Sequence, residues 1–291
     1  MHLLDLPLAV IPIDINPVLI HFGAIAVHWY GLMYVVGIVS GLAVALPFAA
    51  SRDIDRETAY RLFWPILVAA LIGGRLYYVV QSNFGWYLRH PTQMFATWDG
   101  GMAFYGAIFL GGLAALAVCR RQGVSFPLVL DVAALMAPLA QAFGRVGNLI
   151  NGDIIGYPST LPWATRYTNA ANTFVPSHVV AYQPAAGYEL LFCLALFAVL
   201  WTLRRRLQVP GTLFALWLIL YSVGQFVLFF ERANVVVLWG LKQAQLTALA
   251  VIVLAIPLYL IWRYLYSSRS ERAGDAESAP GHGDVAPMVV G

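Results

Sequence analysis

The sequence predicts an all-α, polytopic membrane protein with seven transmembrane helices. Of the 291 residues, 60% are hydrophobic and only 11% are charged, and the mean hydropathy is +0.74. A soluble domain has about a quarter of its residues charged, so this composition indicates a chain that lies largely in lipid. The apolar runs are long enough for helices that cross a bilayer, and they lack the alternation typical of membrane barrels.

Apolar runs between charged or proline-containing stretches give the expected helices. They cover residues 24–50, 60–81, 101–119, 127–150, 184–203, 212–230 and 243–265. Residues 1–23 contain prolines and acidic residues but no lysine or arginine, which predicts an interfacial arm outside the cytoplasm. Residues 151–182 are polar and contain prolines, which predicts a folded external loop. Residues 24–266 would then form one membrane domain, and 267–291 a disordered cytoplasmic tail.

The arginines predict the orientation of these helices. Alternate loops are rich in basic residues, namely Arg52, Arg56, Arg61, Arg120, Arg121, Arg204, Arg205, Arg206, Arg263, Arg269 and Arg272. The loops on the opposite side contain only Arg89, Arg166, Arg232 and Lys242. Basic residues accumulate on the cytoplasmic side of a membrane, so we expect the N-terminus outside and the C-terminus in the cytoplasm.

One stretch concentrates polar residues at the outer end of the fourth expected helix. Residues 143–156 contain Arg145, Asn148, Asn151 and Asp153 together with four glycines. An arginine at the edge of the hydrocarbon normally faces the protein interior or a water-filled cavity. Its planar guanidinium can bind two oxygens of one phosphate at once. The residues alone leave open a structural alternative, in which a helix end hydrogen-bonds its own loop.

Polar residues from six expected helices lie at this same outer level, as the orientation places them. They are His28, Tyr30, Arg75, Tyr105, Arg145, Asn148, Tyr188, Glu189, Gln225 and Arg232. Each has a structural alternative, such as an aromatic belt for His28 and Tyr30, or an ion pair for Glu189 with Arg145 or Arg75. Their joint occurrence favours a cavity for an anionic lipid headgroup. Asp131, near the inner end of the fourth helix, is expected to cap that helix or to face the cytosol.

Several blocks of residues resemble the bacterial prolipoprotein diacylglyceryl transferases. They are 28–34 (HWYGLMY), 73–75 (GGR), 98–102 (WDGGM), 144–153 (GRVGNLINGD), and Pro184 with Tyr188 and Glu189. These blocks follow one another from the first expected helix to the fifth and extend over most of the chain. The block at 144–153 is the most specific of them.

The resemblance implies an activity and a set of site residues. The family transfers the diacylglyceryl group of phosphatidylglycerol to the lipobox cysteine thiol of a preprolipoprotein, giving a thioether and glycerol 1-phosphate. It acts in the bacterial cytoplasmic (inner) membrane, toward the outer leaflet, and no cofactor or metal is implied. The candidate catalytic residues are Tyr30, Tyr105, Arg145, Asn148 and Asp153. The candidate phosphatidylglycerol-binding residues are Arg145, Arg75, His28, Asn151, Gly156, Tyr188 and Glu189.

This sequence departs from the family pattern at several positions. Tyr105 and Gln183 stand where the family commonly has histidines, and Asp153 replaces a glutamate. Gln225 and Phe229 stand where an arginine and a glutamate are expected, although Glu231 and Arg232 follow about one turn later. The general base therefore stays open among Tyr105, His28 and Asp153. A paralogue with a changed lipid substrate or lost activity is the alternative to a divergent active member.

Other classes of protein fit the residues less well. An anion or lipid transporter needs a polar path across the whole membrane, whereas the inner halves of these helices are nearly all apolar. A retinal-type receptor needs a lysine within its seventh helix, but the only lysine, Lys242, lies at the mouth of that helix. The net charge of +3 does not indicate a nucleic-acid partner. Cys119 and Cys193 have neither disulfide nor metal-ligand spacing.

Overall fold

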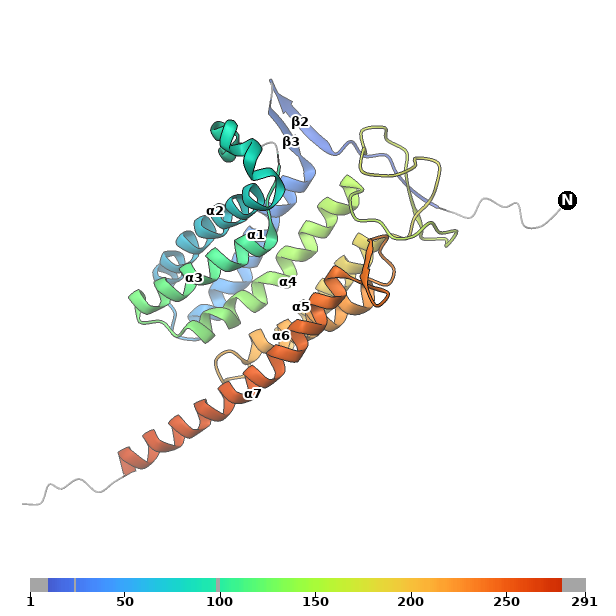
Figure 1. The fold of residues 1–291 in the computed structure, drawn as a ribbon. Coiled ribbons are helices and arrows are strands. Elements are labelled where there is room, and N and C mark those ends of the chain that lie inside the picture. Colours follow the sequence, from blue (N-terminus) through green and yellow to red (C-terminus); the bar gives the residue numbers. More distant parts are fainter. Residues whose placement is uncertain (1–9, 24, 98–99, 279–291) are drawn as a thin grey trace, which may run out of the picture.

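The computed structural model describes residues 10–23, 25–97 and 100–278, and seven α-helices lie within these ranges (Figure 1). They are α1 (Trp29–Ala50), α2 (Arg56–Arg89), α3 (Phe104–Gln122), α4 (Phe126–Asn151), α5 (Ala185–Leu203), α6 (Thr212–Leu228) and α7 (Gln243–Ser278). Six of them are long and apolar enough to cross a membrane, and α6 is a shorter apolar helix. The predicted all-α membrane fold with seven helices is therefore confirmed.

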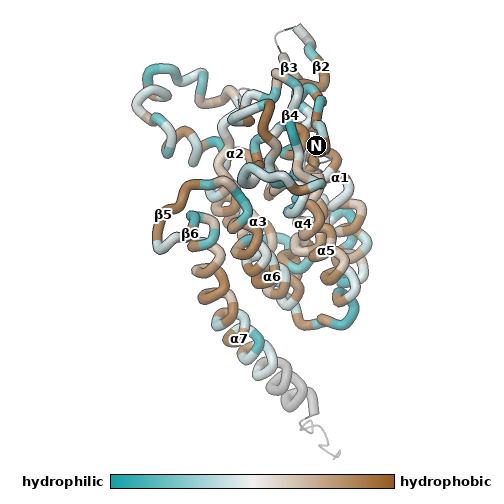
Figure 2. The backbone as a smooth tube through the Cα atoms, turned by 90° about the vertical axis from the view of Figure 1, so that its right-hand side faces the viewer, coloured by the Kyte–Doolittle hydropathy of each residue, from teal (hydrophilic) through white to brown (hydrophobic). Residues whose placement is uncertain are grey.

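The remaining regular elements are short strands and one 3-10 helix. Strand β1 (Ile11–Ile13) pairs in parallel with β4 (Thr165–Tyr167), and β2 (Val18–Phe22) pairs antiparallel to β3 (Ile25–His28). Strand β5 (Val236–Leu238) pairs antiparallel to β6 (Leu241–Lys242), and the 3-10 helix η1 (Pro91–Phe95) follows α2. Figure 2 shows that the long loop after α4 is more hydrophilic than the helices and covers the end of the bundle that also carries β2 and β3.

Close helix contacts depend on glycines. Gly73 of α2 faces Gly106 of α3, and a methyl group on either would clash with the carbonyl oxygen of the other. In the same way, Gly37 of α1 lies against the backbone of Ala140 in α4, where an added Cβ would be 3.0 Å from the carbonyl oxygen. Without a hydrophobic force between helices in lipid, such close backbone approaches supply much of the packing energy.

The N-terminal part of the first expected helix is a strand. Residues 25–28 form β3 because they pair with β2, and α1 begins only at Trp29, with His28 as its extended N-cap residue. The expected start at residue 24 lies outside the described residues, as do residues 1–9 of the arm and Trp98 and Asp99 of one family block.

Two expected helix ends are also wrong. Helix α2 continues beyond residue 81 to Arg89 across a non-helical residue, Asn83, whose side-chain Oδ1 accepts a hydrogen bond from the Trp86 N–H at 3.2 Å. This side chain restarts the helix in the manner of an N-cap. Helix α7 continues to Ser278, so the tail expected to be disordered from residue 267 is helical up to that point. Residues 279–291 lie outside the described residues.

Asp131 has a structural role, but it serves a different helix from the one expected. It is fully buried in α4, where its Oδ2 accepts a hydrogen bond from the Gly211 N–H at 2.8 Å. Its Oδ1 accepts a second one from the Phe214 N–H at 2.9 Å. These donors belong to the start of α6, so Asp131 caps the N-terminus of that helix and complements its dipole from a neighbouring helix.

Replacing Asp131 by alanine is expected to destabilise the protein by about 2 kcal/mol, because two partly buried backbone N–H groups would lose their acceptor. Thermal unfolding of the detergent-purified protein measures this effect. Asp55 is a matched control, because its Oδ1 accepts from the N–H groups of Glu57 and Thr58 at the exposed start of α2. A loss for Asp131→Ala no larger than that for Asp55→Ala would contradict this assignment.

Candidate functional site

Arg145 lies in the last two turns of α4, where the helix ends in a glycine cap. Gly152 has the left-handed φ of +75°, and its N–H donates to the Asn148 carbonyl at 2.8 Å. Any side chain at this position would be strained, and its Cβ would lie 2.7 Å from Val175. The cap turns the chain at the helix end, so Asp153 comes back beside α4.

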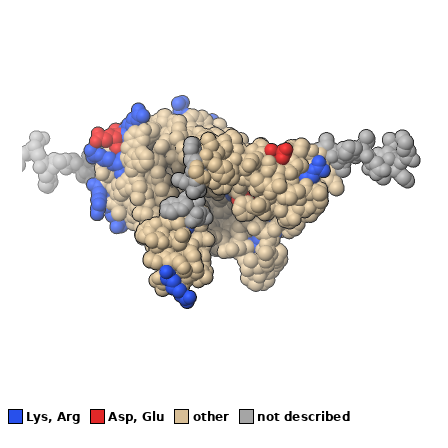
Figure 3. Space-filling view, turned by 90° about the horizontal axis from the view of Figure 1, so that it is seen from above, with Lys and Arg blue, Asp and Glu red and all other residues tan. Residues whose placement is uncertain are grey.

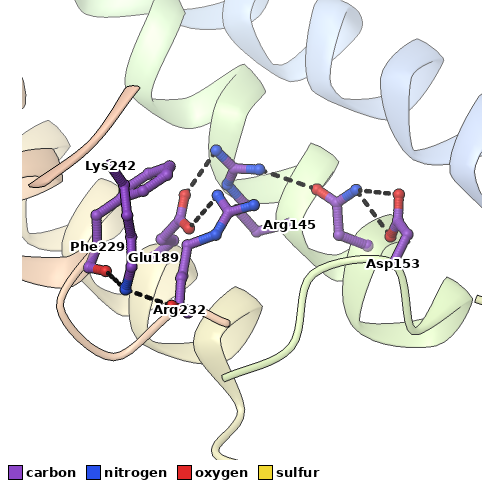
Figure 4. A network of polar contacts seen from close by, with 7 residues as sticks. Arg145, Asp153, Glu189, Phe229, Arg232 and Lys242 are labelled. Carbon is purple, nitrogen blue, oxygen red and sulfur yellow. Dashed lines mark hydrogen bonds and ion pairs between the residues drawn. The ribbon is translucent and has the colours of Figure 1, made fainter. Parts of the chain in front are cut away.

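Glu189 of α5 joins two arginines from other elements (Figure 4). Its Oε2 lies 2.6 Å from NH2 of Arg145, and its Oε1 lies 3.0 Å from NH1 of Arg232, which follows α6. The Glu189 side chain is 0% exposed, and the two arginine side chains are 19% and 13% exposed. A carboxylate is stable at this depth only because both of its oxygens meet a cation.

Asn148 extends the cluster toward the surface. The NH1 group of Arg145 donates to Oδ1 of Asn148 at 3.1 Å, and Nδ2 of Asn148 lies 3.1 Å from both carboxylate oxygens of Asp153. Asn148 is buried and Asp153 is exposed. A continuous polar connection therefore runs from the buried Glu189 to an exposed carboxylate.

Tyr30 approaches this connection from α1. Its ring packs on α4 at Gly147, where an added Cβ would lie 3.0 Å from the ring, and its hydroxyl is 3.0 Å from that of Tyr34. Asn148 and Asp153 are among the polar neighbours of the Tyr30 side chain. The structure thus brings together four of the five predicted catalytic residues, and Tyr105 is the exception.

The position of Arg232 is fixed by Lys242. The buried Lys242 ammonium donates to the carbonyl oxygens of Phe229, Phe230 and Arg232 at the end of α6. A cation is favourable there because it meets several carbonyl oxygens near the negative end of the helix dipole. The Arg232 guanidinium lies 4.3 Å from the Phe229 ring centroid. Burial lowers the pKa of Arg232, and Glu189 only partly opposes this effect. The guanidinium stays charged because the ordinary pKa of arginine lies far above neutral pH.

The cluster retains buried donors that have no acceptor among the described residues. They include Nε of Arg145 and Nε of Arg232. Buried donors without partners are costly, and they mark a place where a ligand oxygen would be favourable. Figure 3, which looks onto this end of the molecule, shows a hollow between two projecting parts with few charged atoms at its edge.

Gly156 and Tyr188 lie at the periphery of the cluster. The Gly156 N–H donates to the Gln183 carbonyl at 2.9 Å, and its Cα faces the carbonyl oxygen of Glu231. The Tyr188 hydroxyl accepts from Trp163 at 2.7 Å and donates to the side chain of Gln183 at 3.1 Å. These contacts hold the long loop, the start of α5 and the end of α6 together around the arginines.

Arg75 lies in a separate set of contacts. It donates to four backbone carbonyls, those of Gln93, Met94, Gly100 and Gly101, at 2.6 to 2.9 Å. The guanidinium therefore fastens the loop between α2 and α3, and no described contact joins it to Arg145. This geometry supports a structural role in place of the expected lipid contact.

Three other predicted residues have no described contact with the Arg145 cluster. His28 is the exposed N-cap residue of α1, and Asn151 is half-buried at the last position of α4. The exposed Tyr105 lines a pocket of about 320 Å³ with Phe229 and Lys242. Its hydroxyl is 3.5 Å from that of Thr247. Phe229 borders both this pocket and the arginine cluster.

Arg232 is the main residue that the sequence-based site omits. Its sequence signal is weak, since it is one of several basic residues expected in outer loops. The α-helix ends at Leu228, and the following residues turn back toward Gly156, with which Arg232 forms an isolated bridge. This turn directs the guanidinium to Glu189. If α6 continued as a regular helix beyond Gln225, its spacing would not predict this position for Arg232.

The fold and the cluster define a polytopic membrane protein with a buried double ion pair near one end of its helices. The sequence model of the family described as prolipoprotein diacylglyceryl transferase matches residues 17–262. The chain therefore belongs to the prolipoprotein diacylglyceryl transferase family, and the predicted resemblance is confirmed.

Individual relatives extend over most of the chain. The phosphatidylglycerol–prolipoprotein diacylglyceryl transferase of Cupriavidus metallidurans is 36% identical over 263 residues, which cover 86% of this chain and 93% of the relative. The protein of the same name from Thermosynechococcus vestitus is 37% identical over 238 residues, covering 81% and 88%. That from Geobacter sulfurreducens is 31% identical over 221 residues, covering 75% and 82%.

Replacing Gly156 by alanine is expected to lower stability by about 1–3 kcal/mol, since its Cβ would lie 2.5 Å from the Glu231 carbonyl oxygen and 2.7 Å from Gln183. Gly144 of α4 is the control, because nothing lies within 4 Å of a Cβ there. Gly144→Ala is expected to leave the melting temperature unchanged or to raise it, since alanine is the better helix former. Equal melting temperatures for the two variants would contradict the close packing at Gly156.

Proposed function

We propose that this protein transfers the diacylglyceryl group of phosphatidylglycerol to the lipobox cysteine of preprolipoproteins, giving a thioether and glycerol 1-phosphate. The observation that carries this proposal is the buried Glu189 paired with the partly buried Arg145 and Arg232, within an apolar helix bundle in a chain of this family. The names of the relatives, each a phosphatidylglycerol–prolipoprotein diacylglyceryl transferase, support the same reaction.

The proposed setting is the bacterial cytoplasmic membrane, with the site toward the outer leaflet. The arginine-rich loops between α1 and α2, α3 and α4, and α5 and α6 lie at the end of the bundle opposite the cluster (Figure 1). Basic loops favour the cytoplasmic side, which puts the N-terminus and the cluster outside. Both substrates are then held in one bilayer, which reduces the entropy cost of bringing them together.

In this proposal Arg145 and Arg232 hold the lipid phosphate. Each has a buried Nε without a described acceptor, and a guanidinium binds phosphate oxygens with well-directed, charge-assisted hydrogen bonds. Arg232 also compensates for one position at which this sequence differs from the family pattern. Gln225 removes one expected arginine, but Arg232 supplies a second guanidinium beside Glu189. This arrangement supports an active member over a paralogue that has lost activity.

The transfer is a displacement at carbon. The cysteine sulfur forms a bond to the glyceryl carbon of the diacylglyceryl group while the bond from that carbon to the phosphate oxygen breaks. The electron pair leaves with glycerol 1-phosphate, and Arg145 neutralises the charge that grows on this leaving group. The thiolate is the reactive form of the substrate cysteine, so its proton must pass to a base.

Asp153 is the base that the geometry supports best. It is exposed, and Asn148 joins it to Arg145, so a thiol reaching the bound phosphate would meet its carboxylate. Tyr105 is directed to Thr247, and His28 lies at the start of α1 without a described contact to the cluster.

Arg145→Ala is expected to reduce thioether formation by about 10²–10³-fold, the usual effect of removing one preorganised charge contact. The measurement is a purified assay with phosphatidylglycerol and a lipobox peptide, read by mass spectrometry. Arg120→Ala, at an exposed arginine ending α3, is the control and should keep full activity. Full activity of Arg145→Ala, or anion flux in liposomes without thioether formation, would exclude the proposed reaction.

Asp153→Asn and Tyr105→Phe are expected to separate the two candidate bases. The asparagine variant should lose about 10²-fold in kcat, because it removes the proton acceptor, and the phenylalanine variant should change kcat less than about threefold. The same assay at saturating lipid gives both values. The opposite pattern would assign proton transfer to Tyr105.

A further inference from the structure

We propose that Glu189 weakens binding of a doubly charged phosphomonoester more than binding of a singly charged phosphodiester, and thereby promotes release of the phosphate product. The inference rests on the proposed function, since it concerns the substrate and product of that reaction. Glu189 acts as a positioning residue: it stays paired with the two arginines and acts on the ligand through its charge.

The geometry puts a fixed negative charge between the two guanidinium groups. Each carboxylate oxygen of Glu189 takes a different arginine, at 2.6 Å for Arg145 and 3.0 Å for Arg232. The three side chains come from α4, α5 and the segment after α6, so separate elements hold the arrangement. Glu189 is 0% exposed, and its charge is therefore screened by protein groups alone.

The other charges near the cluster have separate partners. Asp153 is held by Asn148, and Glu231 accepts a hydrogen bond from Gln183 at 2.7 Å. The Lys242 ammonium is directed to three backbone carbonyls. Glu189 is thus the carboxylate in direct contact with both guanidinium groups that would hold the phosphate.

The two ligands differ in charge. The phosphodiester of phosphatidylglycerol carries one negative charge, whereas a phosphomonoester has a second pKa near 6 and carries almost two at neutral pH. Repulsion by Glu189 is therefore about twice as large for the product as for the substrate. Both are attracted by the same two arginines, so Glu189 limits how much the additional product charge can strengthen binding.

If Glu189 has this role, replacing it should change the relative affinities for product and substrate as well as the stability of the protein. Removing the Glu189 charge should strengthen binding of the product more than binding of the substrate, so turnover would become limited by product release. If the phosphate bound away from this ion pair, so that Glu189 only neutralised the two partly buried arginines, the ratio of the two affinities would stay unchanged.

The test compares Glu189→Gln with Glu189→Asp, which keeps the charge, and with Glu231→Gln, a neighbouring carboxylate outside the double ion pair. In the thioether assay, the inhibition constant of glycerol 1-phosphate relative to the KM of phosphatidylglycerol should fall roughly tenfold for Glu189→Gln, because one close unit charge is lost. Glu189→Asp and Glu231→Gln should keep the wild-type ratio. An unchanged ratio in Glu189→Gln, or the same fall in Glu231→Gln, would overturn the proposal.

A second measurement needs neither catalysis nor a variant. Thermal shifts of the wild-type protein are recorded with glycerol 1-phosphate and with glycerophosphoglycerol, the singly charged phosphodiester that remains when both acyl chains are removed from the lipid. The wild-type protein should bind glycerol 1-phosphate at most about tenfold more tightly than the singly charged compound, because Glu189 cancels the attraction of one arginine. A much larger preference for glycerol 1-phosphate would overturn the inference even if Glu189→Gln does not fold. Absence of thioether formation by the wild-type protein would instead refute the proposed function, while these shifts still test the charge preference.

Discussion

The double ion pair of Glu189 is the contact on which the site depends. A carboxylate that is 0% exposed would be strongly destabilising alone, and two buried guanidinium groups close together would repel each other. Each charge is tolerated because the others are present, so α4, α5 and the end of α6 must meet in one arrangement. The helix packing and the capping contacts hold this arrangement in place.

Backbone features on each side of the pair support it. Gly152 ends α4 in a left-handed conformation, which returns Asp153 to Asn148 and Arg145. Lys242 binds carbonyl oxygens in the segment just after α6, which fixes the turn that carries Arg232. A reactive group held by such secondary contacts needs little reorganisation when charge develops on a ligand, and this is the usual source of electrostatic catalysis.

Apolar runs were sufficient to predict the helices because a segment in lipid must satisfy its own backbone hydrogen bonds. The predicted helix boundaries are wrong where a polar side chain or pairing with a strand determines where the helix begins or ends. Asn83 restarts α2 after a kink, and pairing with β2 keeps residues 25–28 extended. Asp131 was correctly assigned a structural role, but its partners in α6 are far away in sequence, so no local pattern could identify them.

By itself the sequence determined the membrane class, the seven helices, the family resemblance, and the local group of Arg145, Asn148 and Asp153, because helix periodicity and a short turn bring those three residues together. It could not distinguish the roles of Arg75 and Arg232. Both are arginines at the predicted outer level, but one binds four loop carbonyls and the other pairs with Glu189. Only the tertiary structure decided between them, since the partners of a guanidinium are set by the elements folded around it.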